Sequence, residues 1–148
     1  LNAERAAAEW LEVIRNSAGR ATHDAIEAAV DRLWDTMLYD RALETAETIA
    51  REAAASKDLS RSAFAEYKLA QMYARRGQWR RAAALAEGVH SSASGSDDSD
   101  VREIGMRALV LAARYYKAAG DPDAAARVLE ILTSRWSERL QGMVTRER

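Results

Sequence analysis

The clearest fold signal in the chain is the segment 69–86, which reads LAQMYARRGQWRRAAALA. Its apolar residues recur three and four positions apart on both sides of Gly77, which is the spacing of one face of an α-helix. Glycine commonly takes the left-handed conformation that ends a helix, so Gly77 marks a turn. The segment therefore predicts a helix, a tight turn and a second helix.

Two further segments repeat this pattern. The turn at 77–82 (GQWRRA) has counterparts at 37–42 (MLYDRA) and at 120–125 (GDPDAA), and the matching alanines are 40 and 43 residues apart. Each turn lies between two segments with apolar residues at helical spacing. Small residues let two helices approach closely where they cross. The sequence therefore predicts three helix pairs, with Tyr73, Ala82 and Tyr116 buried between helices.

The repeats divide the chain into consecutive segments of one domain spanning residues 1–148. Residues 91–100 (SSASGSDDSD) are polar and low in complexity, which predicts a flexible loop. The predicted segments are an N-terminal helix (1–19), repeat 1 (22–55), repeat 2 (60–90), the loop (91–100), repeat 3 (101–134) and a C-terminal helix (135–148).

Capping residues support the predicted helix starts. Asp121 precedes Pro122, which suits the first position of a helix because its missing N–H has no helical partner there. Asp100 and Glu103 have the spacing of a capping box at the start of the last long helix. Ser60 or Ser62 is the expected cap of the middle one.

The composition agrees with one helical domain. Of 148 residues 48% are hydrophobic and 30% charged, with one proline and no cysteine. These values are typical of a globular all-α protein, and the lack of cysteine excludes disulfides and thiolate metal sites. No apolar run approaches the roughly 20 residues of a membrane span, so no membrane association is predicted and the cytoplasm is favoured.

The middle unit resembles the tetratricopeptide repeat. The residues that carry the resemblance are Leu69, Ala70, Tyr73, Gly77, Trp79, Ala82, Ala86 and Val89, and the third unit keeps Ala113, Tyr116, Gly120, Ala125, Leu129 and Leu132. The period exceeds the usual 34 residues. This longer form is similar to the sensor and regulatory segments of bacterial signalling proteins. The resemblance implies a right-handed solenoid of about three pairs with a helix at each end, acting as a protein-interaction module within a larger bacterial protein.

In this family the first helices of the pairs line a concave groove, here expected at residues 24–35, 64–75 and 107–117. A peptide or helix of a partner protein is the expected ligand, and the candidate partner-binding residues are Glu27, Asp31, Trp34, Phe64, Tyr67, Gln71, Arg107, Arg114 and Lys117. The first of these helices is acidic and the third basic, so they either orient a dipolar ligand or neutralise their neighbours. Trp34 and Phe64 are equally well explained as packing residues.

Two other binding functions stay open. The arginines between Arg75 and Arg81 form a corner that suits an anion or a nucleic acid, although the net charge of −1 disfavours nucleic-acid binding. The apolar face of the C-terminal helix, with Trp136 and Leu140, suits self-association into a homo-oligomer.

Catalysis is not predicted. The two histidines are His23 and His90, and His90 meets Ser91, Ser92 and Asp97 only in the predicted flexible loop, whereas a catalytic triad needs rigid support. The aspartates of that loop lack the glycine and the terminal glutamate of a calcium-binding loop. We therefore expect no catalytic residue, no metal and no cofactor.

Overall fold

The computed structural model describes residues 5, 28, 31–32, 34–35 and 39–146, and this part of the chain is all-helical. Its complete helices are α3 (Tyr39–Ala55), α4 (Leu59–Arg75), α5 (Trp79–Ala93), α6 (Ser99–Ala118) and α7 (Pro122–Arg146). The prediction of an all-α fold is confirmed for these residues. The predicted N-terminal helix (1–19) and most of the first half of repeat 1 lie outside them.

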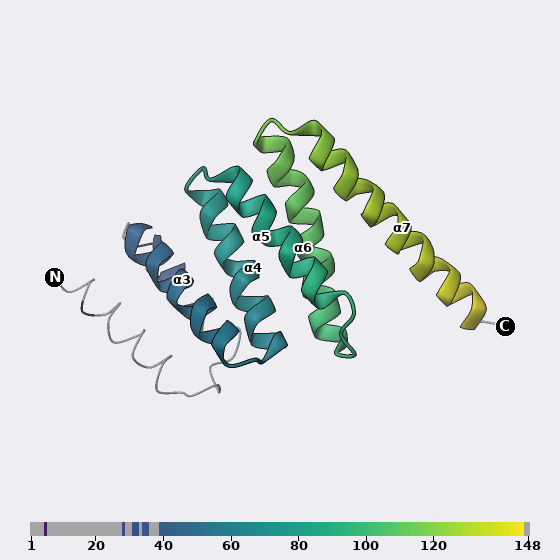
Figure 1. Ribbon diagram of the computed structural model, residues 1–148, viewed down its shortest axis with the longest axis horizontal. Coiled ribbons are helices and arrows are strands. Elements are labelled where there is room, and N and C mark those ends of the chain that lie inside the picture. The colour runs from purple at the N-terminus through teal and green to yellow at the C-terminus, as the bar shows by residue number, and fades with distance from the viewer. Residues whose placement is uncertain (1–4, 6–27, 29–30, 33, 36–38, 147–148) are drawn as a thin grey trace.

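The helices lie side by side in the order of the sequence, and consecutive helices run antiparallel (Figure 1). Each helix packs against the next, and α4 also packs against α6. The first helices of neighbouring pairs are therefore in contact across the stack. α7 diverges from α6 toward its C-terminal end, so the last helix is covered on one side over only part of its length (Figure 1).

The two glycine turns have the predicted geometry. Gly77 and Gly120 adopt φ angles of 78° and 77°, the left-handed region in which glycine has no Cβ penalty. The amide of Gln78 donates to the carbonyl of Tyr73 at 2.9 Å, and the amide of Asp121 donates to that of Tyr116 at the same distance. Both hydrogen bonds close a Schellman-type helix end.

One predicted cap is confirmed and two are wrong. The Asp121 carboxylate accepts from the amide of Ala124 at 3.1 Å, at the start of α7. The cap of α4 is Asp58, which accepts from the Arg61 amide, and not Ser60 or Ser62. The cap of α6 is Asp98, two residues before the predicted Asp100, and its carboxylate accepts from the Asp100 amide.

The predicted loop 91–100 is shorter in the structure. α5 continues to Ala93 and α6 begins at Ser99, so only residues 94–98 connect them. Ala93 is fully buried, and a Cβ placed on Gly105 of α6 would lie 2.9 Å from the Ala93 Cβ. This close packing extends α5 through serines whose composition alone favours a loop.

The predicted boundary between repeat 3 and a separate C-terminal helix is wrong. α7 is one helix of 25 residues that continues through residue 134. No proline or glycine occurs between Asp123 and Gln141, so nothing in the sequence breaks the helix there.

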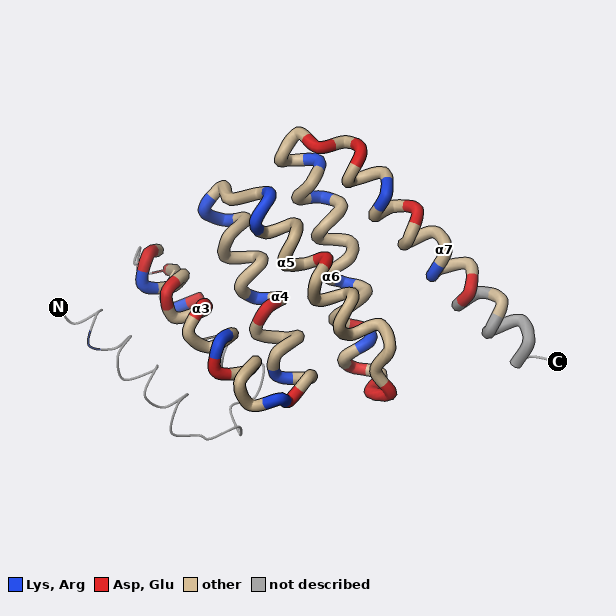
Figure 2. Tube along the Cα trace, viewed as in Figure 1, with Lys and Arg blue, Asp and Glu red and all other residues tan. Residues whose placement is uncertain are grey.

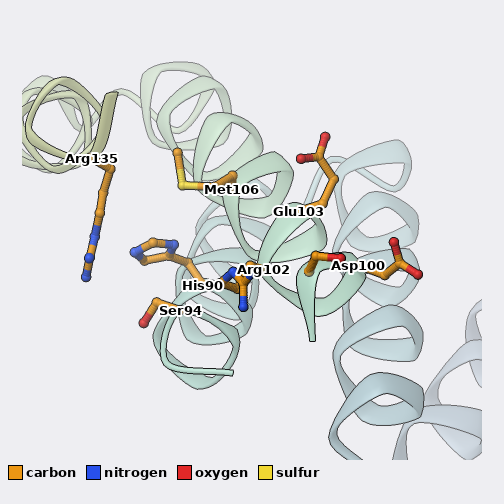
Figure 3. A pocket seen from close by; sticks show the side chains of 8 residues that line it. His90, Ser94, Asp100, Arg102, Glu103, Met106 and Arg135 are labelled. Carbon is orange, nitrogen blue, oxygen red and sulfur yellow. The ribbon is translucent and has the colours of Figure 1, made fainter. Parts of the chain in front are cut away.

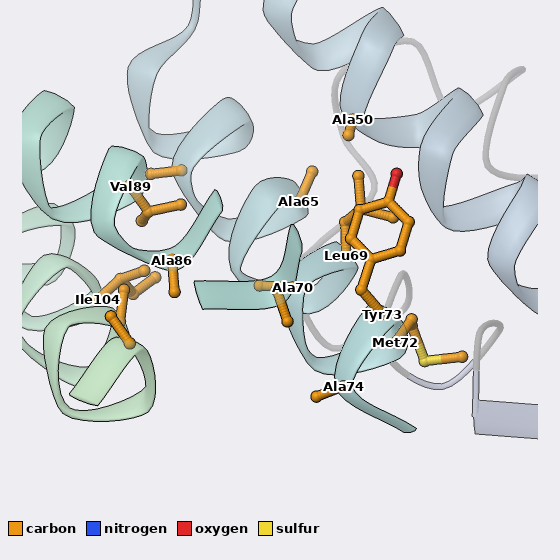
Figure 4. Close-up of a cluster of buried hydrophobic side chains, with 14 of the residues drawn as sticks. Ala50, Ala65, Leu69, Ala70, Met72, Tyr73, Ala74, Ala86, Val89 and Ile104 are labelled. Carbon is orange, nitrogen blue, oxygen red and sulfur yellow. The ribbon is translucent and has the colours of Figure 1, made fainter. Parts of the chain in front are cut away.

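The core is built largely from alanines at the helix crossings (Figure 4). Ala82 is fully buried and Tyr73 nearly so, as predicted, but Tyr116 is only half-buried. The Tyr116 hydroxyl donates to Glu87 at 2.8 Å, which holds the phenol at the edge of the core. The small residues Gly105 and Ala93 let α6 pack closely against α5 where they meet.

Candidate functional site

Of the predicted groove residues of the first helix, Asp31 and Trp34 are already engaged within the protein. Glu27 lies outside the described residues. Asp31 forms ion pairs with two basic residues of α4, with Lys68 Nζ at 2.9 Å and Arg75 Nη1 at 3.2 Å. Lys68 is buried, so its charge depends on this contact. At this end of the molecule, neighbouring first helices therefore neutralise one another.

The predicted aromatic residues pack against the core. Trp34, Phe64 and Tyr67 are half-buried and contact the core cluster, and the Trp34 ring lies 4.4 Å from that of Tyr39. This arrangement favours packing over ligand anchoring for Trp34 and Phe64. Gln71, on the same helix, is half-buried.

The predicted residues of α6 form one exposed stripe. Arg107, Arg114 and Lys117 are exposed at helical spacing, with the exposed Val110 among them. Within the described part of the chain, the ion pair of this stripe is the one that Arg107 makes with Glu103, at 3.4 Å. Figure 2 shows the basic residues along α6. We call the four exposed residues the α6 stripe.

The arginine corner is less available for an anion than its sequence suggests. Arg75 pairs with Asp31, and Arg76 pairs with Asp40 at 3.0 Å. The Arg81 guanidinium lies 4.3 Å from the centre of the Tyr73 ring, a cation–π contact. Arginines that already have such partners would lose them on binding a phosphate.

A largely apolar groove lies between α6 and α7. Its volume is about 460 Å³, and it is lined by Glu103, Met106, Arg107, Val110, Leu132, Thr133 and Trp136. Val110 is 41% exposed and Trp136 is 57% exposed; Leu129, also on α7, is 53% exposed. The groove thus joins the α6 stripe to the face of α7 on which Trp136 lies.

A second, more polar pocket of about 540 Å³ shares Glu103 and Met106 with the groove (Figure 3). His90 lies in its wall with Arg135 of α7 nearby. His90 is buried, and its Nδ1 atom has no hydrogen-bond partner among the described residues. Burial lowers the pKa of His90, which keeps its imidazole neutral at pH 7.

Sequence reasoning found only part of this site. It selected Arg107 for the expected groove and Trp136 for self-association, but it did not combine them in one groove. The available signal was the seven-residue spacing of Leu129 and Trp136, which places both on one face of a continuous helix. The assumed helix boundary at residue 134 separated them.

Other kinds of site find no support in the described residues. There, no three histidine, aspartate or glutamate side chains gather closely enough to hold a metal ion. In the same part of the chain, no helix combines the length and the apolarity that crossing a membrane requires.

Comparisons with protein-family models, with curated proteins and with solved structures give no match to this chain. The likeness to the tetratricopeptide repeat therefore rests on the motif residues and on the helix pairs themselves.

Proposed function

We propose that this protein is a protein-interaction module that binds a peptide or helix of a partner protein. In this proposal the helix pairs form a right-handed solenoid of tetratricopeptide-like repeats that serves a regulatory role in a larger bacterial protein. The observation that carries the proposal is the exposed apolar groove between α6 and α7, with the α6 stripe along its rim.

The groove has the composition of a binding surface. Trp136 in the groove and Leu129 beside it on α7 are both more than half exposed, and burying each fully would contribute about 1.5–3 kcal/mol. A contiguous exposed apolar surface with a polar rim commonly marks a protein-interaction site. Tryptophan and arginine, both present here, are the residues that most often dominate interface energetics.

The site shares its α6 wall with the groove expected from the sequence. Arg107 lines the hollow, and Arg114 and Lys117 continue the same stripe toward the end of α6. The α4 residues Phe64 and Tyr67 are partly covered by the core, so α4 offers a ligand less free apolar surface. The binding surface that we propose is therefore centred on α6 and α7.

A selection experiment tests this proposal. Peptides selected from a displayed random library on the wild-type protein should bind the groove, so Val110→Asp and Leu129→Asp should each weaken them at least about tenfold. Leu59→Asp is the matched control, because Leu59 is an exposed leucine at the start of α4, far along the chain from the groove.

Three results would count against the proposal. Peptides that tolerate both groove substitutions would place binding elsewhere. Peptides that instead require Arg76, Arg80 and Arg81 would favour the arginine corner. A wild-type dimer that Leu129→Asp converts to a monomer in sedimentation would show that the groove serves self-association.

A further inference from the structure

We infer that the occupant of the α6–α7 groove is an α-helix of a partner protein with acidic residues along one flank, lying on α7 as α6 lies on α5. The inference rests on the proposed function and makes it specific for the conformation and the charge of the ligand. Its basis is the difference in burial between equivalent positions of the pairs α4–α5 and α6–α7.

The pairs α4–α5 and α6–α7 match at an offset of 43 residues. The offset superimposes the turn glycines Gly77 and Gly120, and it pairs Tyr73 with Tyr116. Both glycines have the same left-handed conformation and both tyrosine carbonyls accept the bond that closes the turn. Equivalent positions in the two pairs can therefore be compared for burial.

The face of α5 that α6 covers is uncovered in α7. In α5 the residues Ala86, Val89 and Ala93 are fully buried, and Ile104 of α6 belongs to the same buried cluster (Figure 4). Their equivalents on α7 are Leu129, Leu132 and Trp136, of which Leu132 is half-buried and the other two are more than half exposed. The exposed face of α7 thus corresponds to the face of α5 on which a helix packs.

No described segment of the chain covers this face of α7 in the way that α6 covers α5. α5 has 15 residues and the chain turns back directly after Ala93, whereas α7 has 25 residues and continues to Arg146. At the equivalent point, after Trp136, α7 proceeds for ten further residues and diverges from α6 (Figure 1). Within the described residues, α7 thus leads away from the groove at the point where α5 ends and the chain turns back.

The charge of the rim selects an acidic flank. Arg107 lines the groove, Arg114 and Lys117 extend the α6 stripe, and Arg135 lines the adjoining pocket. Among the described residues, Glu103 and Glu138 pair with Arg107 and Arg135 at 3.4 and 3.5 Å, and Asp100 and Arg102 line the same pocket as Arg135, so basic residues still outnumber acidic ones. The net rim charge is positive, so carboxylates on the occupant are favoured.

The chain already contains one contact of this kind. Asp31, from the first helix of the preceding pair, pairs with Lys68 and Arg75 of α4. An incoming helix with glutamates facing the α6 stripe would repeat this contact between neighbouring first helices at the other end of the stack.

The size of the α7 side chains constrains the centre of the occupant. Gly105 of α6 packs directly on Ala93 of α5, where even a Cβ would be too close. Trp136 replaces Ala93 in the α7 register, so an occupant needs glycine or alanine opposite the indole to reach the groove floor. Leucines one turn away on either side can then contact Leu129 and Leu132.

Three synthetic peptides test the inference. Each has about 18 residues, long enough to form a helix on binding, with one leucine and alanine stripe. The first carries glutamate on the flanks, the second carries lysine, and the third is the glutamate peptide with a central proline that prevents a continuous helix. Binding is measured by fluorescence anisotropy, and helix formation by circular dichroism of the complex.

We expect the glutamate peptide to bind at least about tenfold more tightly than the lysine peptide, and the proline peptide to bind weakly. The double variant Arg107→Glu with Arg135→Glu should reverse the charge preference while its thermal melt confirms folding. Leu129→Asp should weaken both helical peptides, whereas Leu59→Asp should weaken neither.

The outcomes separate this inference from the proposed function. Equal affinity for the glutamate and lysine peptides, or undiminished binding of the proline peptide, overturns the inference. If Leu129→Asp still blocks binding in that case, the proposed function stands. Binding that Leu129→Asp leaves unchanged overturns both. A dimer in sedimentation that Leu129→Asp dissociates identifies a second copy of the chain as the occupant and overturns the inference of a partner helix.

Discussion

His90 is a buried histidine whose environment couples the stability of the protein to pH. Burial lowers its pKa, Arg135 reinforces this effect, and the backbone of Gly105 and the carboxylate of Glu87 oppose it. Asp100, Arg102 and Glu103 also line its pocket. A base with a lowered pKa in the folded state binds its proton more weakly there than in the unfolded chain.

The free energy of unfolding should therefore decrease as the pH falls below about 6.5, the ordinary pKa of histidine. The loss should end once the pH is below the lowered pKa of folded His90. Urea unfolding of wild type and of His90→Leu at pH 5, 6 and 7 measures this dependence. The variant should show the smaller decrease; equal decreases in both proteins would mean that His90 titrates as it does in the unfolded chain.

Glu87 links α5 to α7 and to α6. Both of its oxygens pair with the Arg127 guanidinium, and it accepts the Tyr116 hydroxyl. The hydrogen bond from Arg127 is the largest cause that lowers the pKa of Glu87. Since Arg127 is half exposed, solvent weakens the pair, and we expect Glu87→Gln to cost about 1 kcal/mol at pH 7.

The cost of Glu87→Gln should depend on pH in a defined direction. The stabilisation by Glu87 is present above its ordinary pKa of 4.5 and is lost as the pH falls through the lower pKa of the folded state. The urea midpoints of wild type and variant should therefore begin to converge as the pH falls below about 4.5. A constant difference down to pH 3 would show that the amide loses packing rather than charge.

At the scale of elements, the contact of α5 with α6 depends on one glycine. A Cβ on Gly105 would lie 2.9 Å from the Ala93 Cβ, and neither atom can rotate away. Gly88 on α5 has open space where its Cβ would be, so it serves as the control.

Gly88→Ala should raise the stability by up to about 1 kcal/mol, because alanine favours the helix. Gly105→Ala gains the same helix propensity but forces the two helices apart, so it should be about 1–3 kcal/mol less stable than Gly88→Ala. Thermal or urea unfolding measures both. Equal stabilisation by the two alanines would mean that α5 and α6 are not in close contact at Gly105.

Sequence reasoning predicted the elements better than their ends. The spacing of apolar residues and the glycine turns are local signals, so α4, α5 and α6 and the turns at Gly77 and Gly120 were predictable. The end of α5 at Ala93 depends on packing against Gly105, which belongs to the next helix, α6. Composition alone favoured a loop there because serine and aspartate are common in loops.

The candidate site depends on the whole molecule and was harder to predict. Its residues come from two helices, and the groove exists because α7 is continuous and diverges from α6. The sequence supplies the offset of 43 residues between the pairs α4–α5 and α6–α7, but it does not say which face of α5 or α7 a neighbouring helix covers. Only the burial of Ala86 beside the exposure of Leu129 reveals that the described residues cover α5 on a face that they leave uncovered on α7.

The central claim is that ligands bind on the face of α7 that carries Trp136. The most direct test is ¹⁹F NMR of protein labelled with 5-fluorotryptophan, in which Trp136→Phe assigns the Trp136 resonance and Trp79→Phe assigns that of Trp79. Both indoles are exposed, so Trp79 is an internal control at a different surface. On adding the glutamate peptide, the Trp136 resonance should shift, and its solvent isotope effect, the difference in chemical shift between H₂O and D₂O, should disappear. The Trp79 resonance should stay unchanged. A saturating peptide that leaves the Trp136 resonance and its solvent isotope effect unaltered would contradict the account.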